Sequence, residues 1–466
     1  TLVGYEAGRY ATGSYNTFVG SEAGKGGTTS APYSSGENNV ALGYYALKNF
    51  TTGYSNVAIG SHAMDAITDS NNAIGIGAGA LGGTTSTLGS VVLGTNAGNN
   101  ATFGNYNIIM GYTNGQGALG TMNTFIGGAE TGRAATSDYA IGIGAYALQN
   151  TTATGNVGIG HKALQSNTSG AGNLAIGYEA LKVHTTGARN IAIGYQAMDD
   201  TDAGSTSLGS EDNTFIGHNV GGGTWANAAS NGNVGIGNYT MDSALNGALG
   251  NVSLGHYSLS ELTTGDYNVA IGQNAGLSIT TGEKNIAIGR LAGDTMTATS
   301  NTVLIGFEAG QAINATGANG TVAIGYQASY ALTSGANQVS IGYQAGMALT
   351  TAANSTFIGY QAGLTHTGGN NVAIGDRAFS DTDAGSNSLS STFNVAIGNR
   401  AMAGALTDAQ VNGTVAIGYF ALQNATMGGI NYNIAIGMES QKANAGGQNV
   451  AIGYATLKVA DGGETG

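Results

Sequence analysis

The sequence predicts an all-β fold, a parallel β-solenoid of about 26 short coils. The first observation is a repeat: the phrase Asn-Val-Ala-Ile-Gly recurs along all 466 residues in 26 copies, most often 17 residues apart. A fixed short period is typical of solenoids, in which each repeat forms one structural unit. The second is composition, because 82 Gly spread through the repeats make helix costly. The third is the alternation of residue types within each phrase, which predicts a short strand.

Each predicted strand ends at the glycine that closes the phrase, which we call the anchor glycine. The residue before it is aliphatic in all 26 copies, and Val, Ile, Leu or Thr usually stands two places earlier. Residues two apart share one face of a strand, so these two columns form an apolar row. The middle column between them is Ala, Gly or Ser in 18 copies. We expect it to face outwards, where small side chains allow another surface to pack closely.

This middle column is the predicted contact between chains. Phe occupies it in four copies, each time after Thr instead of Val, which indicates either compensation of volume or copying of one ancestral unit. We expect identical chains to associate side by side through this column. Small residues facing solvent on a single solenoid are the alternative. The candidate interface residues are Phe18, Phe125, Phe215, Phe357, Ala58, Ala192 and Ala270.

The rest of each coil is predicted to hold a second apolar segment and two turns. Ala stands three residues after the anchor glycine in 19 copies, usually before Leu, Met or Gly, and a polar turn follows. Asn precedes the strand in 17 copies. Stacked amides hydrogen-bond along other cross-β stacks, so we expect these Asn side chains to bond from coil to coil.

We expect residues 1–466 to form a single continuous array, cut from a longer chain because it starts and stops within a phrase. The coils swell at about residues 21–42, 195–236 and 376–417, where the interval between anchor glycines reaches 23 residues. Insertions in repeat proteins form loops on one face, which is often the binding face.

Charge and composition exclude several classes of protein. There are 13 Lys and Arg against 26 Asp and Glu, a net charge of −13, which is unlike a nucleic-acid-binding protein. No apolar run reaches the ~20 residues of a membrane-spanning helix, so we expect no direct membrane insertion by this segment. The absence of Cys excludes disulfides and thiol catalysis.

We expect no enzymatic activity and no cofactor. Asp200 and Asp202, repeated as Asp381 and Asp383, are a weak calcium candidate, since hard cations prefer clustered carboxylates. A solvated Asx-type turn is the favoured interpretation. Residues 77–82 match G-x-G-x-x-G, but the following helix and the ribose-binding acid of a dinucleotide site are missing.

Tyr follows the anchor glycine in 10 copies, so consecutive coils are expected to stack Tyr on Tyr. An aromatic ladder that supports the solenoid is one interpretation. An exposed Tyr face that contacts sugars or another surface is the other, since amphipathic rings suit contact areas. The single Trp lies in a Gly-rich swelling, where it pins the loop or touches a receptor. The candidate surface-contact residues are Tyr178, Tyr195, Tyr326, Tyr343, Tyr360 and Trp225.

The phrases NNVAIG and NIAIGYQAM resemble the head repeats of trimeric autotransporter adhesins, and are similar to repeats in the shafts of bacteriophage tail fibres. The resemblance covers essentially the whole chain. It implies a left-handed parallel β-roll, three chains side by side, and a rod that projects outwards to bind host surfaces. The adhesin head unit is shorter than the 17-residue coil found here.

We therefore expect an extracellular structural fibre with an adhesive role, on a bacterial cell surface or a virion. It would be a surface adhesin head or a phage tail-fibre shaft. Its expected partners are further copies of itself, as a homotrimer, and a host-cell surface glycan or protein, with no nucleic acid. The alternatives are a self-assembling extracellular filament or sheath subunit, and an ice-binding solenoid suggested by Thr-rich rows of low charge.

Overall fold

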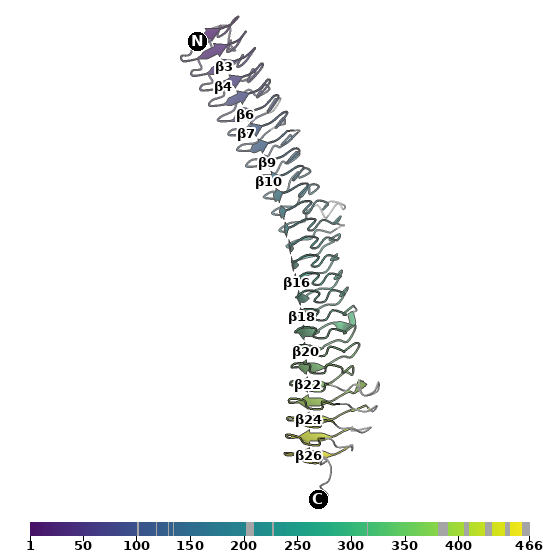
Figure 1. Cartoon of the computed structure of the whole chain (residues 1–466). Coiled ribbons are helices and arrows are strands. Elements are labelled where there is room, and N and C mark those ends of the chain that lie inside the picture. Colours follow the sequence, from purple (N-terminus) through teal and green to yellow (C-terminus); the bar gives the residue numbers. More distant parts are fainter. Residues whose placement is uncertain are drawn as a thin grey trace. The chain divides into compact units, whose positions relative to one another are not determined.

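The computed structural model describes residues 1–99, 102–117, 119–128, 130–133, 135–201, 209–225, 228–314, 316–380, 390–404, 410–424, 431–442 and 448–458. The chain divides into two compact units, Thr1–Asn233 and Val234–Gly466. Each unit is an all-β parallel solenoid with one strand in each coil (Figure 1). The predicted all-β parallel solenoid is therefore confirmed.

Every repeat of the phrase forms one strand of two or three residues. The first unit contains β1 (Leu2–Val3), β2 (Thr17–Val19), β3 (Val40–Leu42), β4 (Val57–Ile59), β5 (Ile74–Ile76), β6 (Val91–Leu93), β7 (Ile108–Met110), β8 (Thr124–Ile126), β9 (Ile141–Ile143), β10 (Val157–Ile159), β11 (Leu174–Ile176), β12 (Ile191–Ile193) and β13 (Thr214–Ile216).

The second unit repeats the pattern, and its described elements include one turn of 3₁₀-helix. Its elements are β14 (Val234–Ile236), β15 (Val252–Leu254), β16 (Val269–Ile271), β17 (Ile286–Ile288), β18 (Val303–Ile305), η2 (Thr316–Ala318), β19 (Val322–Ile324), β20 (Val339–Ile341), β21 (Thr356–Ile358), β22 (Val372–Ile374), β23 (Val395–Ile397), β24 (Val415–Ile417), β25 (Ile434–Ile436) and β26 (Val450–Ile452).

Within each unit a strand pairs in parallel with the next strand along the chain, and each column stays in register. Ala58 of β4 lies opposite Gly75 of β5, and Ala270 of β16 lies opposite Ala287 of β17. A residue type at one position of the phrase therefore stacks on the same position of the next coil. This register turns the columns of the sequence into rows along each unit.

The anchor glycines are required by the stacking. Gly43 and Gly60 have φ angles of 138° and 128°, in a region that L-residues with a side chain rarely adopt. A Cβ on Gly43 would lie 2.5 Å from the carbonyl oxygen of Gly60. No larger residue fits between consecutive coils at this point, which explains why the glycine closes every phrase.

The orientation predicted for the middle column is wrong, because this column points into the coil. Ala58, Ala192 and Ala270 have no exposed surface, whereas the Val and Ile residues on either side of them are half-exposed. The interior at the strand is narrow: a Cβ on Gly75 would lie 2.6 Å from Cγ of Met64 in the preceding coil. Small residues therefore occupy the inside of the strand, and the larger aliphatic residues remain outside.

The four Phe residues of the middle column are also buried, and glycines make room for them. Phe18, Phe125, Phe215 and Phe357 have no exposed surface. A Cβ on Gly24 would lie 2.5 Å from the Phe18 ring, and one on Gly363 would lie 2.8 Å from the Phe357 ring. Coils with a small middle residue commonly carry Leu or Met at the position of these glycines, as at Leu47 and Met198. Volume is thus compensated across the interior of the coil.

The expected ladder of Asn side chains is present. Nδ2 of Asn268 donates to Oδ1 of Asn251 at 3.0 Å, and Nδ2 of Asn285 donates to Oδ1 of Asn268 at 3.0 Å. Each amide also donates to a turn carbonyl of the next coil, for Asn268 that of Gly282 at 2.9 Å. These Asn side chains are fully buried, so the ladder satisfies polar groups that water cannot reach.

In the part of the chain that the structure describes, no helix has the length and apolar character needed to cross a membrane.

Candidate functional site

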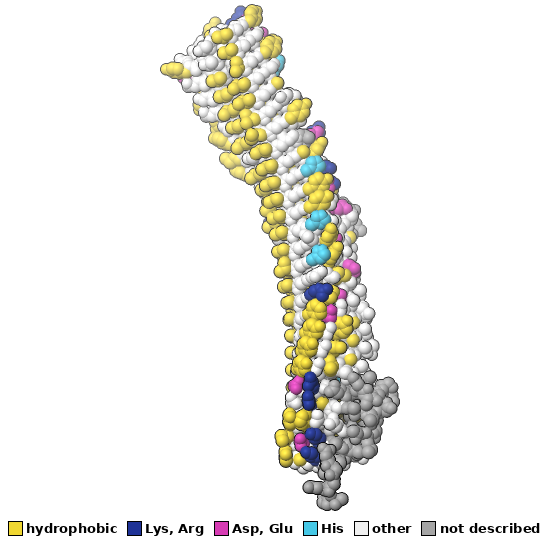
Figure 2. All heavy atoms as spheres, viewed as in Figure 1, with side chains coloured by type: hydrophobic (Ala, Val, Ile, Leu, Met, Phe, Trp, Pro, Cys, Tyr) yellow, Lys and Arg dark blue, Asp and Glu magenta, His cyan; other side chains and the backbone are white. Residues whose placement is uncertain are grey.

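An apolar face lies along the strands of each unit. It is formed by the first and third residues of the strands, which point away from the interior. Leu42 is 47 % exposed and Ile108 41 % exposed in the first unit, and Val252 and Leu254 are 37 % and 45 % exposed in the second. Figure 2 shows hydrophobic side chains in a row on the side where Figure 1 draws the strands. Contiguous exposed apolar surface of this kind marks an interaction site.

This face takes the place of the interface that the sequence suggested. None of the seven candidate interface residues reaches the surface, because the middle column is enclosed by its own coil. A neighbouring molecule on the strand side would instead meet the Val and Ile columns. We call these two columns the aliphatic face.

The stacked tyrosines expected from the sequence are present on the surface. Tyr178 and Tyr195 stack with ring centroids 5.1 Å apart, and Tyr326, Tyr343 and Tyr360 stack at 5.0 and 5.3 Å. All five side chains are exposed at their edges. Because ring faces cover one another within each stack, the surface offers a row of phenol edges and hydroxyl groups rather than open aromatic faces.

The second stack is extended and closed by other side chains. Phe307 stacks on Tyr326 at 5.4 Å, with the guanidinium of Arg290 5.5 Å from the Phe307 ring. At the other end the guanidinium of Arg377 lies 5.5 Å from the Tyr360 ring. Cations over ring faces are attracted by the ring quadrupole, so both terminal faces of this stack are occupied.

A ladder of side-chain amides accompanies the tyrosines. Nε2 of Gln344 donates to Oε1 of Gln327 at 2.9 Å, and Nε2 of Gln361 donates to Oε1 of Gln344 at 3.0 Å. Gln327 also donates to Glu308 at 2.8 Å. These contacts are internal to the array, which favours a supporting role for the Tyr–Gln pairs of successive coils.

Trp225 does not touch a receptor from the surface, and this part of the sequence-based prediction is wrong. Its side chain is fully buried, and its indole N–H donates to the carbonyl of Gly221 at 3.1 Å. The ring lies edge-on to Phe215 with centroids 6.0 Å apart. The alternative, that Trp225 pins the swollen segment to the coil interior, is the one that the structure supports.

The acidic pairs are only partly described. Asp202, Asp381 and Asp383 lie outside the described residues. Asp200 accepts a hydrogen bond from the hydroxyl of Thr224, and its backbone carbonyl accepts one from the N–H of Trp225 at 3.0 Å. Burial, with a smaller contribution from Asp200, raises the pKa of Asp199 to about 6. Among the described residues there is no group of three or more His, Cys, Asp or Glu side chains placed to hold a metal ion.

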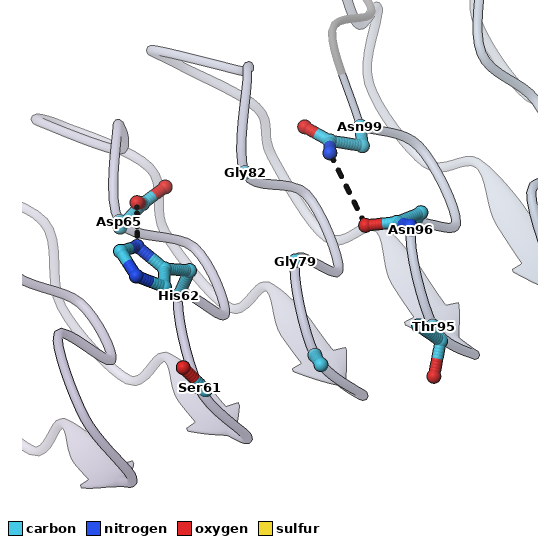
Figure 3. A pocket seen from close by; sticks show the side chains of 9 residues that line it. Ser61, His62, Asp65, Gly79, Gly82, Thr95, Asn96 and Asn99 are labelled. Carbon is cyan, nitrogen blue, oxygen red and sulfur yellow. Dashed lines mark hydrogen bonds and ion pairs between the residues drawn. The ribbon is translucent and has the colours of Figure 1, made fainter.

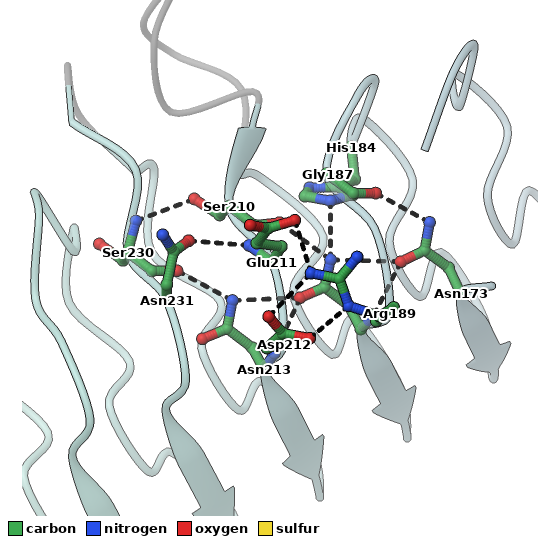
Figure 4. A network of polar contacts seen from close by, with 11 residues as sticks. Asn173, His184, Gly187, Arg189, Ser210, Glu211, Asp212, Asn213, Ser230 and Asn231 are labelled. Atoms are coloured by element: carbon green, nitrogen blue, oxygen red, sulfur yellow. Dashed lines mark hydrogen bonds and ion pairs between the residues drawn. The ribbon is translucent and has the colours of Figure 1, made fainter. Parts of the chain in front are cut away.

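Two histidines, His184 and His366, are buried beside the Asn ladder, each in a coil that precedes a 23-residue interval. Figure 4 shows the first of them, His184. Nε2 of His184 lies 3.0 Å from Nδ2 of Asn190, and Nε2 of His366 lies 2.9 Å from Nδ2 of Asn371. Nδ1 of His184 is 2.9 Å from Oγ1 of Thr201. Burial lowers the pKa of both imidazoles to about 4, so both are neutral at pH 7 and serve the hydrogen-bond network.

An open hollow in the surface of the first unit brings polar side chains together (Figure 3). It has a volume of about 480 Å³. Nδ1 of His62 lies 2.8 Å from Oδ2 of Asp65 on one side, and Nδ2 of Asn99 donates to Oδ1 of Asn96 at 3.4 Å on the other. The lining residues are Ser61, His62, Asp65, Ala78, Gly79, Gly82, Thr95, Asn96 and Asn99.

The sequence alone does not predict this group of residues, although the motif at residues 77–82 is visible in it. The motif supplies the floor of the hollow, and its neighbours one coil away on each side supply the walls. The available signal was the simultaneous loss of polar side chains at three columns of one coil. That signal has meaning only once those three columns are known to point to the same surface.

A scan against models of protein families gives no match, and a search of curated proteins gives none either.

Proposed function

We propose that this chain is an extracellular structural fibre that assembles as a side-by-side homotrimer and attaches to a host-cell surface. The attachment partner would be a surface glycan or protein, and the fibre would belong to a bacterial cell surface or a virion. The proposal combines the resemblance of the repeated phrase to adhesin heads and tail-fibre shafts with the aliphatic face. The number of chains and the left-handed coil come from the resemblance alone.

The aliphatic face is the observation that carries the assembly part of the proposal. Its rows repeat at the spacing of the strands, ~4.8 Å, so a partner that covers them must present apolar groups at the same spacing. Another copy of this chain presents the same apolar columns at the same spacing, because its strands have the same repeat. Packing Val and Ile columns of identical chains against each other removes apolar surface from water, at about 25 cal/mol for each Å² buried. Closed rings of identical chains are the usual outcome of such contacts.

The low charge and the repetition favour a structural role for the array as a whole. Charged residues make up 8 % of the sequence. Side chains of several columns bond to the same column in the next coil, as the Asn and Gln ladders do. Such an array gives length and stiffness, while attachment depends on a minority of coils that differ from the rest.

The assembly is tested by mass and by proximity. Sedimentation equilibrium is expected to give three times the chain mass of 46.1 kDa. Because the chain has no Cys, a single thiol can be placed on the aliphatic face by Ile271→Cys and on an exposed turn by Thr281→Cys. Pyrene attached at position 271 is expected to show excimer emission, and pyrene at 281 is expected not to. A monomeric mass, or excimer emission of equal strength at both positions, would overturn the trimer.

The two alternatives make different predictions in the same samples. A filament or sheath subunit would grow in mass with concentration instead of stopping at three chains. An ice-binding solenoid would be active as a monomer and would produce thermal hysteresis. The structure gives the ice-binding alternative little support, because turn hydroxyls such as those of Thr263 and Thr280 donate to the carbonyl of the next coil.

A further inference from the structure

One coil of the first unit lacks the side chains that its neighbours present to the same surface. The positions one, two and five residues after the anchor glycine are Ser61, His62 and Asp65 in one coil, and Thr95, Asn96 and Asn99 two coils later. In the coil between them the same positions are Ala78, Gly79 and Gly82. With coils ~4.8 Å apart, the missing row leaves polar walls roughly 10 Å from each other, measured between backbones.

The side chains of both walls lean over the glycines. A Cβ on Gly79 would lie 2.6 Å from Oδ1 of Asn96, and a Cβ on Gly82 would lie 3.1 Å from Oδ1 of Asn99 and 3.4 Å from Oδ1 of Asp65. Figure 3 shows the His62–Asp65 pair and the Asn96–Asn99 pair on opposite sides of this bare coil. The hollow thus depends on glycine at two positions where the neighbouring coils have side chains.

The chemistry of the walls selects a class of ligand. One carboxylate, one imidazole, two carboxamides and two hydroxyl groups face the hollow. Together they offer hydrogen-bond donors and acceptors in similar number. Alcohol groups both donate and accept, so a ligand rich in hydroxyl groups can use them all. The volume of about 480 Å³ falls within the range of small-molecule sites, ~300–1,000 Å³.

Anions and added peptide strands fit less well. The glycine-rich floor does not offer free amides to a phosphate, because the N–H groups of Gly79 and Gly82 donate to the carbonyls of Ser61 and Gly79. Asp65 adds a negative charge to the wall. A peptide that extends a sheet needs an unpaired strand edge, and β5 pairs with both β4 and β6.

Aromatic side chains border the His62 wall. The rings of Tyr44 and Tyr45 lie edge-on to the imidazole, with centroids 5.4 and 5.1 Å away. Nδ1 of His62 is held by Asp65, which fixes the ring and directs Nε2 away from that carboxylate. The wall is therefore ordered before a ligand arrives, and less ordering entropy is lost on binding.

We propose that this hollow binds one saccharide unit of a neutral glycan, through hydrogen bonds from its hydroxyl groups to Asp65, Asn96 and Asn99. The proposal rests on the adhesive function proposed above and gives that function a ligand class. The site is a departure from the repeat at residues 78–82 and is not a property of every coil.

The test uses the full chain and saturation-transfer difference NMR with the methyl glycosides of glucose, galactose, mannose, N-acetylglucosamine and N-acetylgalactosamine. Gly79→Gln fills the hollow with a residue that the fold accepts at this column: Gly79 has φ 67°, and Gln327 occupies the same column with φ 52°. Asn274→Gln makes the same side chain at the same column in the second unit, where φ is 56°, and serves as the matched control. Asp65→Asn removes the charge without changing shape.

At least one glycoside is expected to give a transfer signal that Gly79→Gln abolishes and Asn274→Gln leaves unchanged. Asp65→Asn is expected to weaken binding about tenfold, the effect of losing a charge-assisted hydrogen bond. Absence of signal for all five glycosides, or equal signal in the Gly79→Gln variant, would overturn the site. The site would also be overturned if the chain bound peptides of an array, Gly79→Gln abolished that binding, and no glycoside gave a transfer signal.

Failure of the site and failure of the fibre remain distinguishable. Sedimentation and cell attachment are measured on the same Gly79→Gln sample. If Gly79→Gln is a trimer that attaches to cells as strongly as the unsubstituted chain, and neither gives a glycoside signal, the saccharide site is refuted and the proposed fibre stands. If the unsubstituted chain is a monomer but binds a glycoside through the hollow, the proposed trimer is refuted and the proposed site stands.

Discussion

Replacing Asn268 by Ala tests whether the buried amide ladder holds the coils together. Oδ1 of Asn268 accepts from the backbone N–H of Asn285 at 3.1 Å and from Nδ2 of Asn285 at 3.0 Å. Its Nδ2 donates to Asn251 and to the carbonyl of Gly282. Asn268→Ala removes all four interactions while the backbone N–H of residue 268 keeps its bond to Asn251.

The cost follows from the groups left behind. The N–H of Asn285 and the carbonyl of Gly282 each lose a side-chain partner, and both residues are buried. A buried polar group without a partner costs about 1–3 kcal/mol. Nδ2 of Asn285 still donates to the carbonyl of Thr299 at 2.7 Å and adds little. Two such groups give a local destabilisation of about 4 kcal/mol, equivalent to about a thousandfold in an opening equilibrium.

Amide hydrogen exchange is the suitable assay, because a solenoid opens locally and its unfolding need not be two-state. The N–H groups of Val269 and Ile286, which bond to the next coil, are expected to exchange about a thousandfold faster in Asn268→Ala. Asn268→Thr is expected to destabilise the coil less than Asn268→Ala. Thr302 already takes this role directly after the run of Asn residues, with Oγ1 2.8 Å from Oδ1 of Asn285.

Asn274→Gly is the control for the loss of an Asn side chain from the same unit. Asn274 lies on the turn, its Oδ1 has no hydrogen-bond partner, and its φ of 56° suits Gly, so a change below about 1 kcal/mol is expected. The reasoning about the ladder is refuted if Asn268→Ala accelerates exchange less than tenfold, or no more than Asn274→Gly does.

Three further predictions concern buried groups. Burial lowers the pKa of His184 and of His366 to about 4, against about 6.5 in the unfolded chain. Because the unfolded chain therefore binds protons first as the pH falls, each site should lose about 2 kcal/mol of local stability between pH 7 and pH 5. Hydrogen exchange measures this loss, and His184→Gln is the pH-insensitive reference. Trp225→Ala should destabilise its coil by about 3–5 kcal/mol through loss of a fully buried side chain, seen as faster exchange there alone. Gly363→Leu should clash with the Phe357 ring and lower the melting temperature. Adding Phe357→Ala to the same chain should restore much of the lost melting temperature. Volume compensation would be contradicted if the double variant melted no higher than the less stable of the two single variants.

The sequence was sufficient to predict the positions of the strands and the contacts within columns. Each phrase coincides with a strand, and the Asn and Tyr columns stack as expected. These features follow from register alone, because a fixed repeat in a parallel solenoid places equivalent residues on one another. No knowledge of the interior is needed to predict them.

The sequence was not sufficient to decide which face of the strand is buried. Alternation shows that Val57 and Ile59 share a face opposite to Ala58, but it does not say which face is inside. Burying the larger residues is the usual expectation. It failed because the interior is filled from the other wall, by residues such as Met64 and Ile67, and only a small residue fits against them. The width of the coil, which single phrases do not reveal, decides the matter.

The same lesson applies to the hollow and to where binding specificity lies in a repeat array. Coils that follow the pattern satisfy one another, so their side chains are engaged along the columns and have little left for a ligand. A ligand site arises where a column is interrupted, as at Gly79, because the side chains of the coils on either side then lose their stacking partner and face an open space. The motif at residues 77–82 is not a dinucleotide site, because the helix and the ribose-binding acid that such a site needs are missing. Its significance lies in what is absent from it, since Gly79 and Gly82 leave Asp65, Asn96 and Asn99 facing solvent across a gap of one coil.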